Sequence, residues 1–230
     1  MEYISDGFGK ALEIIFSGNR EFLDIVWVSV AVASCSTALA AVSGVVFGIS
    51  VALNQFRGRG ALVTVLNTLM SLPTVVVGLL VYSFLSRRGP LGPLGLLYTR
   101  TAMVIGQWIL AFPIIAALTV AAVRNVDPRV RLTALSLGAN PRQSVFIFLR
   151  EARFGIAAAV IAGFGRVFAE VGVSMMLGGN IKTYTRNITT AIALETSKGE
   201  FALAIALGLV LLAVALAVNV LFAVFRNRTI

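Results

Sequence analysis

Long stretches without a single charged residue constrain the fold of this chain more than any other feature. An α-helix rises about 1.5 Å per residue, so about 20 apolar residues cross the roughly 30 Å hydrocarbon core of a bilayer. Four stretches reach this length with no Asp, Glu, Lys or Arg, and a fifth reaches it with two charges near its middle. The sequence therefore predicts an all-α membrane protein with five transmembrane helices, over residues 25–54, 61–86, 101–123, 154–178 and 201–225.

The composition supports lipid as the solvent for most of these residues. Of the 230 residues, 58% are hydrophobic and 13% are charged, whereas a soluble domain carries about 25% charged residues and about 45–50% apolar ones. A globule of this size cannot bury such an excess of apolar side chains. The net charge of +9 would also suit a nucleic-acid partner, but basic residues that flank apolar segments are typical of membrane proteins. We therefore expect membrane lipid, and no nucleic acid, as a partner.

The absence of histidine excludes several kinds of site. The chain has no histidine and one cysteine, which excludes a histidine-ligated haem or zinc site, a Ser-His or Cys-His catalytic pair and an intrachain disulfide. A membrane-anchor subunit of a redox enzyme is disfavoured for the same reason. An intramembrane protease is disfavoured because no Asp lies inside a predicted span. We expect no catalytic residue, no metal site and no cofactor site in this chain.

Charges outside the spans predict the orientation. Five spans place the two termini on opposite sides of the membrane. With the N-terminus outside, the inner segments hold 10 basic residues against 8 in the outer ones, and most acidic residues lie outside. We therefore predict an outer N-terminus and a cytoplasmic C-terminus. Residues 1–23 are predicted to form an extracytoplasmic amphipathic segment, with a frayed leader as the alternative, because apolar residues recur there at helical spacing: Phe8, Leu12, Ile15 and Phe16.

The longest inner loop, residues 124–153, carries start and stop signals for two short helices. Asp127 and Asn140 each precede a proline, as N-cap residues often do. Gly138 lies between them and favours the left-handed conformation that ends a helix. The pattern predicts two helices joined by a tight corner, over residues 128–137 and 141–152. Such an elbow either docks into a groove of a partner protein or is held at lipid headgroups by its arginines.

The run from Leu132 to Ala139 carries a family resemblance. Its alanine, its glycine and their spacing resemble the EAA signature of ABC importer permeases, the cytoplasmic elbow that engages the ATPase subunit. The chain departs from that signature at Leu132 and Thr133, where the family usually has Glu-Ala, and at Glu151, near the position of the family's proline. The resemblance implies that the following residues couple the chain to the ATPase: Thr133, Ala134, Leu137, Gly138, Ala139, Asn140, Pro141 and Arg142.

The resemblance extends over nearly the whole chain, and several segments resemble one branch of the family. Residues 165–179 resemble the corresponding helix of permeases for tetrahedral oxyanions such as molybdate and sulfate, and residues 67–85, 88–92 and 180–204 resemble the tungstate permease branch. The implied fold is that of a type I ABC importer permease. Residues 24–226 would be its transmembrane domain, and the 124–153 loop would be its cytoplasmic coupling region. The implied function is ATP-driven import of tungstate or a similar oxyanion by alternating access.

The chain lacks the motif that would bind the nucleotide. No Gly-x-x-x-x-Gly-Lys-Ser/Thr run is present, and the Gly9–Lys10 pair has no glycine at the required distance before it. ATP and Mg would therefore bind to a partner subunit, and we do not expect this chain to be an enzyme. The resemblance implies a prokaryotic inner membrane, a homodimer of this chain, two ATP-binding ABC subunits and an extracytoplasmic oxyanion-binding protein.

Two prolines and two charges lie near the middle of predicted spans. Pro73 and Pro113 are expected to kink their helices, which lipid tolerates only where neighbours or a cavity satisfy the freed backbone groups. Arg166 and Glu170 are four residues apart and would share a helix face. They either line or gate the translocation path, or form an internal ion pair that fixes helix packing.

Hydroxyl side chains are the better candidates for transient contact with an oxyanion. They donate hydrogen bonds without the deep trap that a fixed positive charge would create. Packing between membrane helices is the alternative role for such residues. The candidates are Ser71, Thr74, Thr189 and Thr190.

Basic residues before the last span predict an outer vestibule. Lys182, Arg186 and Lys198 would collect an anion or dock the binding protein, and an ordinary solvated loop is the alternative.

Two other functions of the whole chain stay open at this point. One is a stand-alone anion carrier or channel, disfavoured because inverted repeats are not evident and 230 residues is short for a carrier. The other is a molybdate or sulfate permease subunit of the same family.

Overall fold

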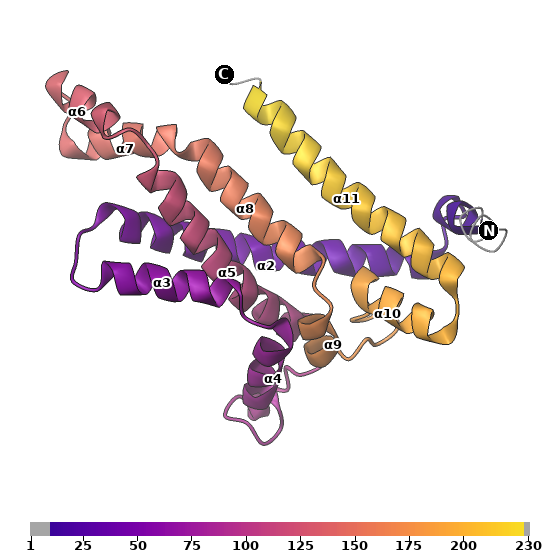
Figure 1. The fold of residues 1–230 in the computed structure, drawn as a ribbon. Coiled ribbons are helices and arrows are strands. Elements are labelled where there is room, and N and C mark those ends of the chain that lie inside the picture. Colours follow the sequence, from indigo (N-terminus) through magenta and orange to yellow (C-terminus); the bar gives the residue numbers. More distant parts are fainter. Residues whose placement is uncertain (1–9, 228–230) are drawn as a thin grey trace.

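The computed structural model describes residues 10–227, and every regular element in that range is a helix (Figure 1). This confirms the all-α class. Residues 10–16 are helical and precede α2. The remaining elements are α2 (Arg20–Leu53), α3 (Arg59–Met70), α4 (Thr74–Leu85), the short 3-10 helix η1 (Gly92–Leu94), α5 (Arg100–Arg124), α6 (Pro128–Ser136), α7 (Pro141–Glu151), α8 (Arg153–Phe168), α9 (Gly172–Gly178), α10 (Ile188–Lys198) and α11 (Phe201–Asn227).

Three of the predicted spans are continuous helices that are long and apolar enough to cross a membrane. They are α2, α5 and residues Phe201–Val224 of α11. The other two are bent pairs: α3 and α4 meet at 97°, and α8 and α9 meet at 60°. The described chain therefore has five spans if each bent pair counts as one. The first bend is much sharper than the proline kink expected within residues 61–86.

Regular helical hydrogen bonding is interrupted at both bends. Pro73 has no N–H to continue α3, and it precedes α4 in an extended conformation. In the second pair, the carboxylate of Glu170, just before the N-cap Val171, accepts a hydrogen bond from the backbone N–H of Val173 in the first turn of α9 at 3.2 Å. The expectation that Arg166 and Glu170 share a continuous helix face is therefore wrong, because α8 has already ended at Phe168.

Pro113, in contrast, does not interrupt its helix. Helix α5 runs through Pro113 from Arg100 to Arg124. It is packed against α2 and α8, and Ala111 and Ile115 are fully buried. Contacts of this kind stabilise a membrane helix across a proline.

Glycines bring the neighbouring helices close to α5. Gly44 and Gly48 lie four residues apart on α2, and a Cβ at Gly48 would lie 2.7 Å from the carbonyl oxygen of Ala116. A Cβ at Gly163 of α8 would lie 2.6 Å from a side-chain carbon of Ile115. Small residues at this spacing allow helix backbones in lipid to approach closely. Helix α5 is thus the centre of the bundle.

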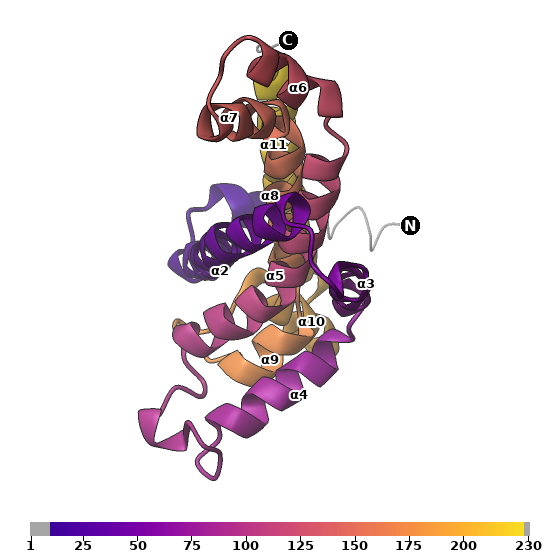
Figure 2. The same cartoon turned by 90° about the vertical axis from the view of Figure 1, so that its left-hand side faces the viewer.

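The molecule has two distinct ends. The elbow formed by α6 and α7 lies at one end, together with the C-terminal end of α11, and α4, α9 and α10 lie toward the other (Figures 1 and 2). Helix α11 is much less covered than α5, since 17% of its most apolar window is buried against 67% for α5. A helix that is so apolar and so exposed has to be covered by lipid or by another chain.

The N-terminal segment presents part of its apolar spacing to the core and part to the outside. Ala11 and Ile15 pack against the main core, whereas Leu12 and Phe16 are exposed. Phe8 lies outside the described residues.

Candidate functional site

The two helix breaks lie against each other where α4 packs on α9 (Figure 2). Gly172, the first residue of α9, lies at the contact. A Cβ at this position would lie 3.1 Å from the hydroxyl oxygen of Thr74 and 3.3 Å from a carboxylate oxygen of Glu170. A side chain would have to push these groups apart. The fold therefore brings together predicted path residues from two spans that are far apart in the sequence.

Glu170 is the buried charge at this junction. It forms an ion pair with Arg166 at 2.8 Å, in which its side chain is 3% exposed and that of Arg166 is 37% exposed. Its other carboxylate oxygen accepts from the N–H of Val173, and its backbone carbonyl accepts from the hydroxyl of Thr189 at 2.7 Å. A buried carboxylate is tolerated when its charge is paired and its oxygens are hydrogen-bonded. Glu170 thereby joins α8, α9 and α10.

The unequal exposure of this pair decides which charge the junction presents. The carboxylate is enclosed, while part of the guanidinium remains accessible. An anion that approaches this surface therefore meets the positive partner first. A carboxylate on a translocation path would repel an anion, and the burial and pairing of Glu170 reduce that repulsion.

Two of the four hydroxyl side chains predicted to contact an oxyanion are hydrogen-bonded within the protein instead. Thr189 is buried, and its hydroxyl oxygen also lies 3.0 Å from the side-chain oxygen of Asn187. Thr190 is buried and forms a capping box with Asn187 at the start of α10. The next backbone N–H, that of Ile188, donates to the hydroxyl of Ser29 on α2 at 2.6 Å. These contacts fit the packing role rather than contact with a substrate.

Ser71 and Thr74 have hydroxyls that are free of such contacts. They flank Pro73 at the first break, Ser71 exposed and Thr74 half-buried, and neither side chain is hydrogen-bonded within the described part of the chain. Helix α4 begins here without a side-chain cap. The first N–H groups of a helix are unpaired and carry partial positive charge, which favours an anion. Within the described part of the chain, these two hydroxyls and this helix start are hydrogen-bonding groups at the junction that the fold does not use.

A buried polar chain that the sequence analysis missed supports the same junction. The hydroxyl of Ser36 on α2 donates to the side-chain oxygen of Gln107 on α5 at 3.0 Å. The Gln107 amide in turn donates to the hydroxyl of Ser174 on α9 at 3.1 Å. All three residues are buried. The sequence contained a signal for this buried polar chain, because Gln107 is the only amide side chain in the predicted span 101–123.

The three predicted vestibule residues are all paired with carboxylates. Lys182 and Arg186 both contact Glu21, in the first turn of α2, at 2.8 and 3.5 Å. Lys198 contacts Glu195 at 3.0 Å on α10. Arg186 is the most buried of the three, whereas Lys182 and Lys198 reach solvent. The loop therefore presents less free positive charge than its sequence implies.

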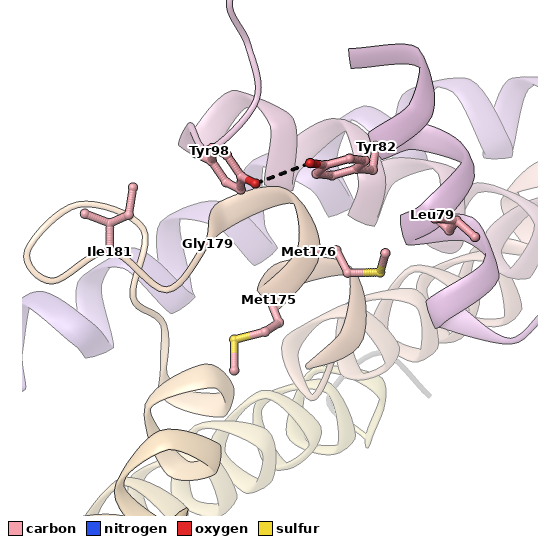
Figure 3. A pocket seen from close by; sticks show the side chains of 7 residues that line it. All are labelled: Leu79, Tyr82, Tyr98, Met175, Met176, Gly179 and Ile181. Carbon is pink, nitrogen blue, oxygen red and sulfur yellow. Dashed lines mark hydrogen bonds between the residues drawn. The ribbon is translucent and has the colours of Figure 1, made fainter. Parts of the chain in front are cut away.

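A cavity of about 690 Å³ opens beside the α4–α9 contact (Figure 3). The hydroxyls of Tyr82 and Tyr98 meet at its edge, 3.5 Å apart. A tyrosine hydroxyl is neutral near pH 7, and this hydrogen bond raises the pKa of Tyr98 further above its ordinary value of 10.0. The cavity thus offers no charge to an anion. Its lining residues are Leu79, Tyr82, Tyr98, Met175, Met176, Gly179 and Ile181.

The elbow has the two-helix structure predicted from its N-cap residues, its prolines and its glycine. Asp127 caps α6 by accepting from the N–H of Arg129, and Asn140 forms a capping box with Gln143 at the start of α7. Gly138 has a φ of 88° between them, a conformation that L residues rarely adopt. The corner is therefore determined by local sequence.

The elbow exposes large apolar side chains. Leu137 is 82% exposed and Phe146 is 68% exposed, whereas Phe148 and Leu149 pack toward the ends of α2 and α5. Of the predicted coupling residues, Ala134 is buried and Ala139 half-buried, Pro141 begins α7, and the others are exposed: Thr133, Leu137, Gly138, Asn140 and Arg142. Exposed apolar groups rimmed by polar ones are typical of a protein-binding surface.

Known proteins resemble this chain over most of its length. Residues 44–230 match the family described as the binding-protein-dependent transport system inner membrane component. The tungstate uptake system permease protein TupB of Peptoclostridium acidaminophilum is 43% identical over 219 residues, which are 95% of this chain and 96% of that protein. The protein of the same name from Campylobacter jejuni is 40% identical over 219 residues, covering 95% and 92%.

A solved structure shares the fold at low sequence identity. It is a bacterial ABC transporter involved in the import of the acidic polysaccharide alginate, and it aligns with a TM-score of 0.75 at 19% identity, over 96% of this chain and 83% of that one.

Proposed function

This chain belongs to the family of binding-protein-dependent transport system inner membrane components, and on that premise we propose that it is the membrane-spanning subunit of an ATP-driven importer of tungstate. It is a multi-pass permease subunit of the inner membrane and not an enzyme, since ATP hydrolysis is carried by a separate subunit of such systems. An ATP-binding partner and a substrate-binding partner follow from the same family. The two tungstate uptake relatives support tungstate as the substrate.

The observation that carries the transport mechanism is the contact between the two helix breaks. Ser71, Thr74 and the uncapped start of α4 offer hydrogen-bond donors there, and Arg166 adds a partly exposed positive charge. An oxyanion would be bound by donors that can also release it. Glu170 holds Arg166 in place and accepts from the N–H of Val173 in the first turn of α9. In alternating access, the two bends are the points at which the path changes shape.

Coupling to ATP hydrolysis would act through the elbow. Closure of the ATP-binding subunits would move α6 and α7 through exposed side chains such as Leu137 and Phe146. The elbow continues directly into α5 and α8, the central helix and the first half of a bent pair. Two copies of this chain would surround one path, with an outer N-terminus and with the elbow and the C-terminus in the cytoplasm.

The first experiment tests the assembly. The chain is gently extracted from its native membrane, and the co-purifying chains are identified by mass spectrometry. We expect a stoichiometric subunit with a P-loop, and a secreted binding protein whose affinities for tungstate, molybdate and sulfate can be titrated. Recovery of the chain alone as a folded oligomer would refute ATP-driven import and favour a stand-alone carrier. Preferential binding of molybdate or sulfate would refute the substrate.

The second experiment tests the path. The Ser71→Ala/Thr74→Ala double variant should assemble normally and lower tungstate uptake in proteoliposomes severalfold. Thr68→Ala is the matched control, because the Thr68 hydroxyl bonds to its own helix at the carbonyl of Thr64. Equal uptake by the double variant and the control would contradict the assignment.

A further inference from the structure

A second cavity lies at the joint between the elbow and the membrane helices. Its volume is about 440 Å³. The ends of α2 and α5, the start of α3 and both elbow helices contribute to its wall. Two arginines, Arg59 and Arg124, lie in a lining that is otherwise largely apolar and includes Leu53, Val123, Leu132 and Phe148.

Arg59 is fixed beside this cavity with unused hydrogen-bond donors. One terminal nitrogen donates to the carbonyl of Ala52 at 2.6 Å, which holds the guanidinium against the end of α2. Its Nε is buried and has no partner in the described part of the chain. Arg124 is exposed in the last turn of α5. Within residues 10–227, neither arginine forms an ion pair with a carboxylate.

The backbone adds to this uncompensated positive charge. Helix α3 begins after Gly58 without a side-chain cap, and Arg59 is its first residue. Unpaired N–H groups at a helix start favour a negatively charged ligand. The cavity therefore combines donors for an anionic group with an apolar wall.

We propose that this cavity binds the phosphate headgroup of an acidic phospholipid, with an acyl chain along the apolar wall. Helices α2 and α5 are both long enough to span the bilayer, so the residues at their ends lie at headgroup level. Guanidinium groups match phosphate geometry with paired hydrogen bonds, and basic pockets between membrane helices are typical sites for anionic headgroups. A free phosphate would leave the apolar wall of the cavity exposed to water, whereas the acyl chain of a lipid would cover it.

This site has a functional consequence that is separate from the substrate. The cavity wall includes Leu132 and Leu135 of α6 and Phe148 of α7 as well as the ends of the membrane helices. A bound lipid would therefore stabilise one position of the elbow relative to the bundle. Acidic lipid would regulate how motion of the elbow is transmitted, whichever oxyanion is carried.

The test measures lipid binding rather than transport. The full chain is purified with its associated subunits in a neutral detergent, as wild type, as Arg59→Gln/Arg124→Gln and as the matched control Arg87→Gln/Arg88→Gln, whose charges lie in the loop after α4. Native mass spectrometry then counts retained phosphatidylglycerol. Thermal melting is followed with added phosphatidylglycerol, phosphatidylcholine or inorganic phosphate.

We expect wild type and control to retain phosphatidylglycerol and to melt at a higher temperature with it. Retention should fall at least fivefold in Arg59→Gln/Arg124→Gln. Equal retention would overturn the proposal, and so would stabilisation by inorganic phosphate equal to that by the lipid, which would indicate a free-anion site. If the double variant does not fold, Leu132→Trp fills the cavity from an exposed elbow position and keeps both arginines. Wild-type lipid retention by Leu132→Trp would equally overturn it.

Discussion

Arg166 and Glu170 form one ion pair, but the two residues differ greatly in what their loss would leave behind. Without Glu170, Arg166 can turn toward solvent or headgroups, because it is already partly exposed. Without Arg166, the enclosed carboxylate keeps its bond to Val173 but loses its counter-charge. A buried charge that loses its partner is strongly destabilising. The pair is therefore asymmetric, and the positive member is the one that stability depends on most.

Arg166→Gln should destabilise the assembled protein by about 1–3 kcal/mol, and more than Glu170→Gln. Glu170→Gln should impair assembly or turnover while the preference between tungstate and molybdate is kept. Thermal melting in detergent and competitive uptake in proteoliposomes measure the two effects. Equal melting of the two variants would contradict the asymmetry, and a changed substrate preference in Glu170→Gln would place this carboxylate in contact with the anion.

Gly172→Val should separate the two breaks, because its side chain would meet Thr74 and Glu170. Overpacking of this kind costs about 1–3 kcal/mol, and we expect tungstate uptake to fall severalfold. Gly165→Val on α8 is the matched control, since no atom lies within 4 Å of the position of its Cβ. The measurements are melting temperature and uptake rate. Similar losses in both variants would show that the contact between the breaks does not matter.

Local sequence signals predicted the two helices of the elbow, whereas tertiary contacts determined which of the other helices bend. Asp127, Gly138 and Asn140 act through their own turns, so their sequence pattern was sufficient to predict two helices and a corner. Pro73 and Pro113 were treated alike, yet the first lies at a 97° bend and the second within an intact helix. The difference lies in the helices packed around α5, which a single sequence does not reveal.

The same limit applied to the candidate site. Spacing placed Arg166 near Glu170, and the ion pair is present. Spacing could not show that the Thr189 hydroxyl donates to the backbone carbonyl of Glu170, because the two residues are 19 positions apart in the sequence. Nor could spacing show that Glu21 would pair with Lys182 and Arg186 from the far end of the chain.

Phe146→Asp on the elbow should leave the melting temperature of the chain unchanged, because this side chain is exposed. It should lower co-purification of the ATP-binding subunit at least fivefold, since a charge would be buried in the contact. Phe56→Asp is the control, an exposed phenylalanine in the turn between α2 and α3. The assay is quantitative mass spectrometry of the extracted complex. Normal recovery of the partner with Phe146→Asp would remove Phe146 from the coupling surface.

Over the whole molecule, the basic residues differ in whether they have carboxylate partners. At the elbow end, Arg59 and Arg124 have no carboxylate partner within the described residues, whereas Lys182 and Lys198 are paired with Glu21 and Glu195. Lys182→Ala/Lys198→Ala should lower uptake about twofold with assembly intact, and the effect should shrink at high salt because exposed charges are screened. Lys10→Ala is the control. Uptake kinetics equal to wild type at low salt would refute an outer vestibule.

The hydrogen bond from Thr189 to Glu170 also bears on how the protein is made. During synthesis the bend between α8 and α9 leaves the ribosome before α10 does, so the carbonyl of Glu170 has no partner until residue 189 has followed it into the membrane. A chain that stops before α10 therefore leaves this carbonyl without its partner, and an unsatisfied backbone group in lipid is energetically costly. In pulse-chase labelling, a chain truncated after residue 187 should be degraded faster than one truncated after residue 199. Equal half-lives would show that the turn is stable without its last partner.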